Sequence, residues 1–234
     1  MESEAMKKYK AQEAKRVEIN LHHLENGVEF VDLYTAYIEE DVEIGRGTVI
    51  GPCVTLKGNT VIGENCVIGQ NSRVENCRIA DGVEIQSSVL LDSSVGEGTK
   101  VGPFAYVRPG SKVGAHCKVG DFVEIKNSAF GDGSKASHLT YIGDSDVGSG
   151  VNLGCGVVFV NYDGTNKYRS TVEDGAFIGC NSNLVSPVTV GAGAYIGAGS
   201  TVTEDVEADA LYAARAKGVT KEGWVSRKGI LKKK

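Results

Sequence analysis

The sequence has few of the features that mark several common classes of protein. Only 4 of its 234 residues are proline, and no stretch reaches the roughly 18 consecutive apolar residues that a membrane-spanning helix needs. The 6 cysteines form no Cys-x-x-Cys pair, which argues against zinc ribbons and CxxC redox motifs and predicts free thiols. Residues 1–16 are charged and contain no apolar signal-peptide core. We therefore expect a cytoplasmic protein with no membrane partner.

The charge pattern shows no footprint for nucleic acid. The net charge is −5, and lysine and arginine are scattered except in the tail Lys232 to Lys234. A protein that binds a phosphate backbone gathers its basic residues on one face, so we expect no nucleic-acid partner. Several glycine-rich segments occur, but none completes a P-loop or a dinucleotide-binding fingerprint.

The abundant residue is glycine, with 31 copies, and it accompanies a six-residue repeat. An aliphatic residue recurs at every sixth position, with occasional five-residue steps, in three clear runs: Ile44, Ile50, Leu56, Ile62, Ile68 and Val74; Val95, Val101, Val107, Val113, Val119 and Ile125; Val172, Ile178, Leu184, Val190, Ile196 and Val202. Roughly 27 such positions can be assigned, enough for about nine triangular coils of three hexapeptides. The pattern predicts an all-β, single-stranded parallel β-helix in which stacked coils bury the aliphatic residues.

The segments outside the repeat complete the domain organisation. Ala14, Val17, Leu21 and Leu24 fall at helical spacing and Asn26-Gly27 ends the run, which predicts a short N-terminal helix. Three parts follow: residues 1–27 are a lead-in with a helix over 4–25; residues 28–207 are the β-helix, interrupted by a polar inserted loop over 161–170; residues 208–234 are a short helix over 208–217 and a basic tail.

Four histidines differ in their settings. His22 and His23 lie near the C-terminal end of the predicted helix, where a surface role suits the helix dipole. His116 belongs to an ordinary hexapeptide and is expected to be solvated. His138 lies beside a five-residue step and is the best candidate for a general base, because neutral imidazole accepts a proton near pH 7. The residues alone leave a purely structural role for His138 open.

Three cations interrupt the small or acidic residues at comparable positions of the repeat. Arg108, Lys126 and Lys167 together could bind a phosphate, although each one alone also fits a solvated face. A β-helical zinc site of the carbonic anhydrase kind needs three histidines, and the repeat contains only His116 and His138. We therefore expect no metal.

Longer motifs resemble one protein family. They are Arg108-Pro109-Gly110, the segment from Asp121 to Lys126, the segment from Ser134 to Asp144, Val151-Asn152, the segment from Asn161 to Gly164, and the segment from Lys221 to Trp224. In this order they resemble the bacterial bifunctional N-acetylglucosamine-1-phosphate uridyltransferase and glucosamine-1-phosphate N-acetyltransferase family. The resemblance extends from about Lys7 to the end of the chain but covers only the family's C-terminal, acetyltransferase half. Uridyl transfer is therefore expected to be absent, whether the chain is a truncated or a freestanding enzyme.

The resemblance implies a fold, an assembly and a reaction. It implies a left-handed β-helix, a handedness that the repeat alone does not give, and a homotrimer with the active site between subunits. It implies acetyl transfer from acetyl-CoA, as co-substrate, to the amine of glucosamine 1-phosphate, without a metal, in the synthesis of UDP-N-acetylglucosamine for peptidoglycan and the cell wall. The partners would thus be two further copies of the chain and a small aminosugar phosphate.

The resemblance also assigns site residues. It implies that His138 is the catalytic base, that the aminosugar-phosphate pocket contains Arg108, Lys126, Tyr141, Asn152 and Lys167, and that acetyl-CoA contacts Cys155, Asn161, Tyr162, Cys180, Ala198 and Arg215. Cys155 and Cys180 stand where some members have Ala and Ser. A thiol beside a thioester raises the alternative of a covalent acyl-enzyme, but neither has a basic neighbour in sequence.

Two rival functions differ in what they predict. A non-catalytic hexapeptide solenoid would have lost the pocket residues. In this sequence, every position that the resemblance assigns to the sugar site still holds a residue suited to that role. Another hexapeptide acyltransferase, acting on serine, a diaminopimelate precursor or a lipid A sugar, would lack the Asn-Tyr-Asp-Gly insertion together with Arg-Pro-Gly. Both features are present in this sequence.

Overall fold

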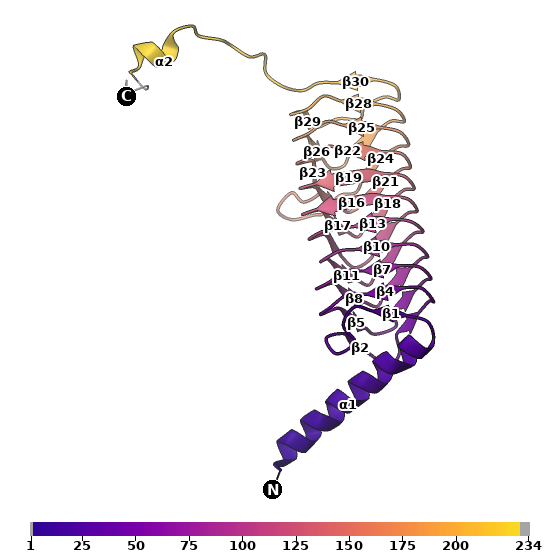
Figure 1. Ribbon diagram of the computed structural model, residues 1–234. Helices are drawn as coiled ribbons and strands as arrows, with labels where there is room; N and C mark the ends of the chain where they lie inside the picture. Colours follow the sequence, from indigo (N-terminus) through magenta and orange to yellow (C-terminus); the bar gives the residue numbers. More distant parts are fainter. Residues whose placement is uncertain (1, 230–234) are drawn as a thin grey trace.

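The computed structural model describes residues 2–229 and has the form of a parallel β-solenoid with a single long helix at its start. Helix α1 (Glu4–Glu25) leads into the first coil, and the chain then winds upward through three parallel sheets (Figure 1). The three sheets have 11, 10 and 9 strands, which amounts to about ten coils of three short strands each. The fold class predicted from the hexapeptides is confirmed, with one coil more than the spacing indicated.

Sheet A contains β1 (Glu29–Phe30), β4 (Val49–Ile50), β7 (Val67–Ile68), β10 (Glu84–Ile85), β13 (Lys100–Val101), β16 (Lys118–Asp121), β19 (Lys135–His138), β22 (Asn152–Leu153), β25 (Phe177–Ile178), β28 (Tyr195–Ile196) and β30 (Leu211–Tyr212). Sheet B contains β2 (Tyr37–Ile38), β5 (Thr55–Lys57), β8 (Arg73–Glu75), β11 (Val89–Leu91), β14 (Tyr106–Val107), β17 (Glu124–Lys126), β20 (Tyr141–Gly143), β23 (Val158–Val160), β26 (Asn183–Val185) and β29 (Thr201–Val202). Sheet C contains β3 (Glu43–Ile44), β6 (Val61–Ile62), β9 (Arg78–Ile79), β12 (Ser94–Val95), β15 (Lys112–Val113), β18 (Ala129–Phe130), β21 (Ser145–Val147), β24 (Ser170–Val172) and β27 (Thr189–Val190).

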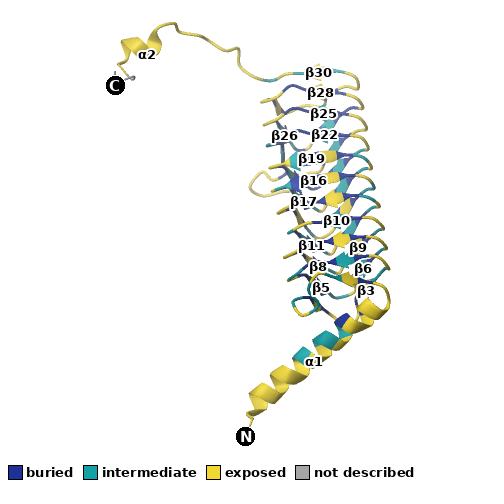
Figure 2. Cartoon of the chain, viewed as in Figure 1, coloured by how far each residue is buried: buried dark blue, intermediate teal, exposed yellow. Residues whose placement is uncertain are grey.

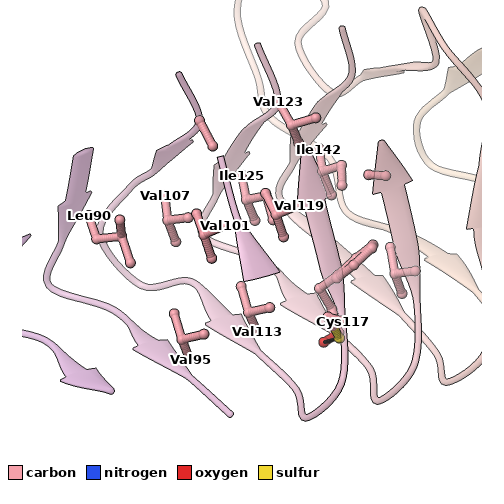
Figure 3. Packing of buried hydrophobic residues seen from close by; sticks show 14 of the residues in the cluster. Leu90, Val95, Val101, Val107, Val113, Cys117, Val119, Val123, Ile125 and Ile142 are labelled. Carbon is pink, nitrogen blue, oxygen red and sulfur yellow. Dashed lines mark hydrogen bonds between the residues drawn. The ribbon is translucent and has the colours of Figure 1, made fainter. Parts of the chain in front are cut away.

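The core is a column of aliphatic side chains along the solenoid axis. Successive strand residues point to opposite faces, so one residue of each two-residue strand faces outward and the next faces the axis. In β7, Val67 is 40% exposed and Ile68 is 0% exposed. Figure 3 shows the inward residues of neighbouring coils in contact. Stacking thus buries residues that no single coil could bury.

The corners of the triangle explain the glycines and the small polar residues. Gly98 and Gly110 have φ of +63° and +77°, a conformation that glycine adopts without steric cost. Small side chains that lie two residues before the aliphatic residue point inward, and Cys66 and Cys117 among them are 0% and 3% exposed. The Thr48 hydroxyl accepts a hydrogen bond from the Cys66 N–H at 3.0 Å in the next coil. These contacts satisfy backbone groups that a corner would otherwise leave unpaired.

Substitution of Ile68 by Ala is expected to lower the free energy of unfolding by about 2–5 kcal/mol, because it leaves a cavity in the buried column. The matched control is Val67→Ala on the same strand, whose side chain is 40% exposed and whose loss should cost less than about 0.5 kcal/mol. Urea denaturation of both variants measures the difference. Equal effects of the two substitutions would contradict this assignment of the two faces.

Helix α1 forms over the predicted residues and docks through its C-terminal half. The Ser3 hydroxyl caps it by accepting a hydrogen bond from the Met6 N–H. The Asn20 amide donates to the carbonyl oxygens of Leu33 and Ala36 at 2.8 and 3.1 Å. Figure 2 shows the N-terminal turns of the helix exposed and the part nearest the first coil more buried.

One histidine on this helix departs from the expected surface role. His22 is exposed, but His23 is only 7% exposed because the helix end packs against the solenoid. Burial lowers the pKa of His23, with a smaller effect from the neighbouring His22. The prediction of a surface role for His23 is therefore wrong, since periodicity did not reveal which side of the helix end meets the first coil.

The C-terminal region also differs from the expectation. The helix predicted over 208–217 is absent, and Leu211–Tyr212 form β30, which pairs with β28 and adds a strand after the expected end of the repeat at 207. The segment contains alanines that favour a helix, but its backbone instead forms hydrogen bonds with the unpaired edge of β28 at the end of sheet A. A short helix, α2 (Trp224–Arg227), lies further on, in a segment that extends away from the solenoid (Figure 1). The Lys232–Lys234 tail lies outside the described residues.

A search of the described residues for a helix long and apolar enough to span a membrane finds none.

Candidate active site

The first element of the site is a histidine–carboxylate pair at the corner where sheet A turns into sheet B. His138 ends β19 and Asp121 ends β16 one coil below, and the two residues are in register. His138 Nδ1 lies 2.6 Å from Asp121 Oδ1. A carboxylate at this position accepts the Nδ1–H hydrogen bond and leaves Nε2 with a free lone pair, which is the tautomer that a general base requires. The His138 side chain is 54% exposed, so a reactant can reach it.

The backbone around this pair is unusually close-packed. Strands β16 and β19 are four residues long, whereas most strands have two residues. Gly120 directly precedes Asp121 in β16. A Cβ on Gly120 would lie 1.9 Å from the carbonyl oxygen of Ser137, so only glycine allows the two coils to approach here. The hydrogen bond from His138 lowers the pKa of Asp121. The carboxylate is therefore ionised at neutral pH and stabilises a positive charge on the imidazole.

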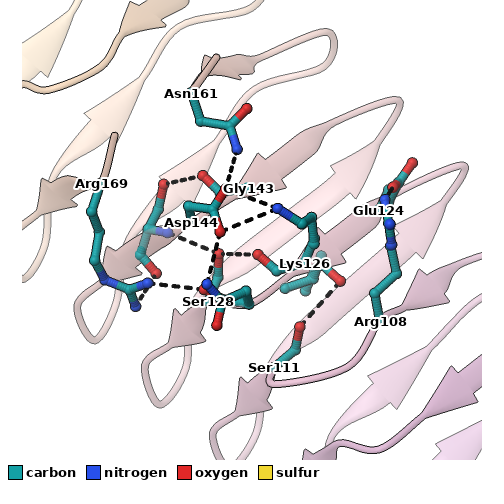
Figure 4. A network of polar contacts seen from close by, with 12 residues as sticks. Arg108, Ser111, Glu124, Lys126, Ser128, Gly143, Asp144, Asn161 and Arg169 are labelled. Carbon is teal, nitrogen blue, oxygen red and sulfur yellow. Dashed lines mark hydrogen bonds and ion pairs between the residues drawn. The ribbon is translucent and has the colours of Figure 1, made fainter. Parts of the chain in front are cut away.

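A second cluster surrounds Asp144 at the opposite edge of sheet B (Figure 4). Its carboxylate accepts hydrogen bonds from Lys126 Nζ at 2.9 and 3.2 Å, from Asn127 Nδ2 at 2.7 Å and from Asn161 Nδ2. The side chains of Lys126 and Asp144 are 18% and 11% exposed. Burial alone would raise the pKa of Asp144, but the hydrogen bonds from Asn127, Lys126 and Asn161 outweigh it and lower the pKa. The same ion pair raises the pKa of Lys126.

The outer face of sheet B connects the two edges. Glu124 and Tyr141 are register neighbours on β17 and β20, and Arg108 Nη1 donates to Glu124 Oε1 at 2.6 Å. A Cβ on Gly143 would lie 2.4 Å from the Tyr141 hydroxyl and 2.8 Å from Asn161 Nδ2. Glycine at position 143 therefore allows the Tyr141 ring to lie along the face toward Asn161. The face presents a guanidinium, a carboxylate and a phenol between the His138 corner and the Asp144 cluster.

The inserted loop projects from the side of the solenoid (Figure 1) and is anchored at both ends. Asn161 holds its start through Asp144, and Arg169 holds its end by donating from Nε to Asp146 at 2.6 Å and from Nη1 to the Asn127 carbonyl oxygen at 2.9 Å. Inside the loop, Asp163 accepts hydrogen bonds from the N–H groups of Thr165 and Asn166. The loop is therefore a folded turn with fixed ends.

The tip of this loop presents two predicted site residues to solvent. Tyr162 is 54% exposed and forms an isolated bridge with Lys167. Lys167 lies close to Lys126 and, in the described part of the chain, has no acidic partner within ion-pair distance. Two cationic side chains close together can bind one anion. The loop thus brings Lys167 to the edge of sheet B that holds Lys126.

Four of the six residues predicted for acetyl-CoA lie along one corner of the solenoid, whereas Asn161 and Tyr162 belong to the inserted loop at the other edge of sheet B. Cys155, Cys180 and Ala198 lie one coil apart at the same corner as His138, because Leu153 pairs with Ile178 two residues earlier in the chain. Cys180 and Ala198 are exposed, and Cys155 is partly exposed. Arg215 reaches this column from the C-terminal segment and donates to the Ala198 carbonyl oxygen. This column of corner residues, the track, runs from His138 toward the last coil.

One predicted pocket residue lies apart from the others. Asn152 begins β22 and occupies the outer face of sheet A between Lys135 and Phe177, whereas Arg108, Lys126 and Tyr141 belong to sheet B. Within one chain the corner at His138 separates Asn152 from them. A single subunit thus presents two parts of the predicted pocket on two faces.

Several residues with clear roles in this geometry were not identified as site residues from the sequence. They are Asp121, Glu124, Asn127, Asp144 and Arg169. The signal that finds four of them is the length of one coil: Asp121 lies 17 residues before His138, Asn127 lies 17 before Asp144, Asp144 lies 18 after Lys126 and 17 before Asn161, and Glu124 lies 16 after Arg108. Arg169 has no such regular spacing, because the loop interrupts the count.

The chemistry available here is proton transfer and anion binding. An imidazole oriented by a carboxylate can take a proton, and the cations of sheet B and the loop can hold a phosphate. The described residues contain no group of three or more His, Cys, Asp or Glu side chains arranged to hold a metal ion.

Comparison with known proteins places the chain among relatives. Residues 34–111 match the family described as the GMPPB C-terminal domain, and residues 169–204 match the bacterial transferase hexapeptide family. The chain is 54% identical over 222 residues to the bifunctional protein GlmU of Clostridium beijerinckii, covering 95% of this chain and 49% of that protein. The chain is therefore similar to one half of GlmU. The resemblance inferred from the motifs is thus confirmed.

Other comparisons give the extent of this relationship. GlmU of Geobacillus sp. is 53% identical over 95% of this chain and 48% of its own length, so the chain spans about half the length of the GlmU proteins it matches. Among solved structures, UDP-N-acetylglucosamine acyltransferase from Francisella novicida is 20% identical with a TM-score of 0.44, covering 83% of this chain and 72% of that one.

Proposed function

We propose that this chain transfers acetyl from acetyl-CoA to the amine of glucosamine 1-phosphate and yields N-acetylglucosamine 1-phosphate. The observation that carries the proposal is the His138–Asp121 pair at one edge of a face that holds Arg108, with Lys126 and Lys167 at its other edge. The high identity to GlmU over nearly the whole chain supports the choice of substrate. The product is a precursor of UDP-N-acetylglucosamine, which cells use to build peptidoglycan.

The mechanism follows from the charges of the reactants. The substrate amine is an ammonium that must lose a proton before its nitrogen can attack a thioester, and Nε2 of His138 takes that proton. The nitrogen then attacks the thioester carbonyl carbon and forms a tetrahedral oxyanion, which collapses as the C–S bond breaks and the CoA thiolate leaves. Asp121 stabilises the imidazolium throughout these steps. The proton on His138 returns to the thiolate, and the second proton that the attacking nitrogen carries in the tetrahedral intermediate passes to water, so the overall reaction yields the amide, CoA thiol and one released proton.

The binding roles divide between the two edges of the site. Lys126 and Lys167 hold the phosphate, Arg108 and Tyr141 contact the sugar along sheet B, and Asn161 and Tyr162 lie between sugar and thioester. Cys155, Cys180, Ala198 and Arg215 line the track for acetyl-CoA along the corner. The split of Asn152 from the other sugar contacts supports a homotrimer in which a neighbouring copy completes the pocket. The cytoplasmic location expected from the sequence stays a prediction.

Thiol release tests this function. Protein given acetyl-CoA and glucosamine 1-phosphate in the presence of a chelator should release CoA thiol, and glucosamine, serine and glucose 1-phosphate serve as comparison acceptors. Transfer to glucosamine 1-phosphate alone at high efficiency supports the proposal. Efficient transfer to serine would favour another hexapeptide acyltransferase. No release of CoA thiol with any acceptor would favour a non-catalytic solenoid, and equal release with and without an acceptor would indicate hydrolysis of the thioester.

The Asp121→Asn variant tests the orienting carboxylate. An Asn amide can donate to Nδ1 and leave the proton on Nε2, so kcat/KM is expected to fall about 10–100-fold, less than in a fully buried triad because this pair is half-exposed. The KM values for both substrates should stay close to those of the wild type, because Asp121 acts through the imidazole. Asp121→Glu should restore part of the rate. A loss of activity that lies in KM, or that Asp121→Glu does not restore, would assign Asp121 a structural role only.

A further inference from the structure

Two cysteines lie side by side on the corner that the proposed function assigns to acetyl-CoA. Leu153 and Ile178 are register partners on β22 and β25, and Cys155 and Cys180 follow each of them by two residues. The Asn181 N–H donates to the Cys155 carbonyl oxygen at 2.8 Å, which keeps the two corners in step beyond the strands. The two thiol residues therefore occupy the same position in consecutive coils.

Side chains at this corner position in consecutive coils are close enough to touch elsewhere in the same structure. Asp121 lies at the same corner two coils before Cys155, and His138 lies there one coil before it. Their side chains are 2.6 Å apart. The Leu139 N–H donates to the Asp121 carbonyl oxygen at 2.9 Å, the same backbone link that joins the two cysteine corners. Neighbouring strands lie about 4.8 Å apart, within the Cα separation of about 4.4–6.8 Å that disulfides span.

The remaining cysteines lack this combination of pairing and access. Burial raises the pKa of the Cys66, Cys77 and Cys117 thiols, which keeps them protonated and unreactive. Cys53 is exposed, but the residue at the same corner position in the next coil is Asn71, so Cys53 has no cysteine beside it there. Among the described residues, Cys155 and Cys180 are the one in-register pair of cysteines that solvent reaches.

We propose that Cys155 and Cys180 form a reversible disulfide when the protein meets a peroxide. One thiolate attacks a peroxide oxygen and becomes a sulfenic acid as hydroxide leaves; the second thiol attacks that sulfur, the S–S bond forms, and water leaves. The two thiols together lose two electrons and two protons, and hydrogen peroxide is reduced to two molecules of water. In-register parallel strands hold the Cβ atoms further apart than a relaxed disulfide prefers, so the bond is easily reduced by a dithiol.

The disulfide would change the acyl-donor track, an effect that rests on the proposed function. The bridge replaces two separate side chains with a rigid link midway between His138 and Ala198 on the same corner. A thioester carbonyl that must reach His138 along this corner then meets two side chains that are fixed in one geometry and cannot move aside. Oxidation should therefore weaken acetyl-CoA binding and leave the sheet B contacts to the aminosugar phosphate intact.

Peptide mapping tests the bond without any assumption about activity. The full chain is treated with hydrogen peroxide, alkylated and digested with trypsin, which places Cys155 in peptide 136–167 and Cys180 in peptide 170–215, each with no other cysteine. The expected product is a cross-link between these two peptides that disappears after dithiothreitol. The Cys53→Ser control should give the same cross-link, and Cys155→Ser should give none.

Kinetics on the same samples test the consequence. Oxidised protein should show a KM for acetyl-CoA at least tenfold higher, restored by dithiothreitol, whereas the Cys155→Ser variant should keep its own rate after peroxide. Absence of the cross-link, while iodoacetamide labels both thiols in the reduced protein, would overturn the proposal. A cross-link with an unchanged KM would overturn the effect on the track. A cross-link in a protein inactive even when reduced would instead contradict the proposed function.

Discussion

Replacement of His138 by Asn is expected to lower kcat about 10²–10⁴-fold, the range that a positioned general base contributes. An Asn side chain cannot accept a proton from the substrate ammonium, although it can still donate a hydrogen bond to Asp121. The KM values for both substrates should change little, because the proposed phosphate contacts of Lys126 and Lys167 and the acyl-donor corner do not include the imidazole. Steady-state kinetics with each substrate varied in turn measures this split.

The matched control is the same substitution at His116, which lies at a corner with φ of +55° that Asn adopts readily. His116→Asn should keep the full rate. If His138→Asn retained more than about a tenth of the wild-type kcat, the general-base role would be lost, since a base supplies at least 10²-fold. A similar fall in kcat in both variants would indicate that the substitutions damage the solenoid.

Replacement of Asp144 by Asn is expected to lower the free energy of unfolding by about 2 kcal/mol and to raise the KM for glucosamine 1-phosphate. The variant leaves the ammonium of Lys126 without its charged partner in a setting where that side chain is only 18% exposed. It also weakens the anchors of Asn127 and Asn161, and hence the start of the loop that carries Lys167. Urea denaturation and kinetics with varied sugar phosphate measure the two effects.

The pH dependence of this effect has a definite sign. Because the pKa of Asp144 is lower than its ordinary value of 3.8, the ion pair stabilises the fold above about pH 4 and loses this contribution as pH falls through the lowered pKa. The matched control is Asp146→Asn, whose ion pair with Arg169 is about half exposed and should contribute less than about 1 kcal/mol. Equal losses in the two variants would contradict a special role for the Asp144 cluster.

The sequence predicts the repetitive part of the fold well because each hexapeptide carries its own signal. Three kinds of residue recur in each coil: an aliphatic residue that faces inward, a small residue at the corner, and a glycine or asparagine with a positive φ angle. The prediction of a helix over 208–217 is wrong because the segment contains residues that favour a helix, while the unpaired edge of β28 that captures Leu211–Tyr212 is visible only in three dimensions. The handedness of the solenoid came from the family resemblance, since the usual crossover rule favours the opposite hand.

The candidate site is predictable only in part, because its contacts join residues one coil apart. His138 stands out in the sequence, yet its partner Asp121 is one acidic residue among 30 until the 17-residue spacing is read as a coil. Asp144 is similarly inconspicuous, although it holds Lys126 and Asn161 together. Arg169 cannot be found in this way, because the inserted loop adds residues and its partners are not separated from it by the length of one coil. A scan for polar residues separated by one coil would have found the first two.

Direct observation of the product tests whether the protein acetylates the sugar amine with His138 as the base. Wild-type protein and the His138→Asn variant are each given acetyl-CoA labelled with ¹³C at the carbonyl carbon, together with glucosamine 1-phosphate and a chelator. NMR should show the label in an amide on the sugar nitrogen with the wild type, and only a trace of this amide with the variant in the same time. Formation of the amide at equal rates by both proteins, or label in an ester or free acetate, would contradict this expectation.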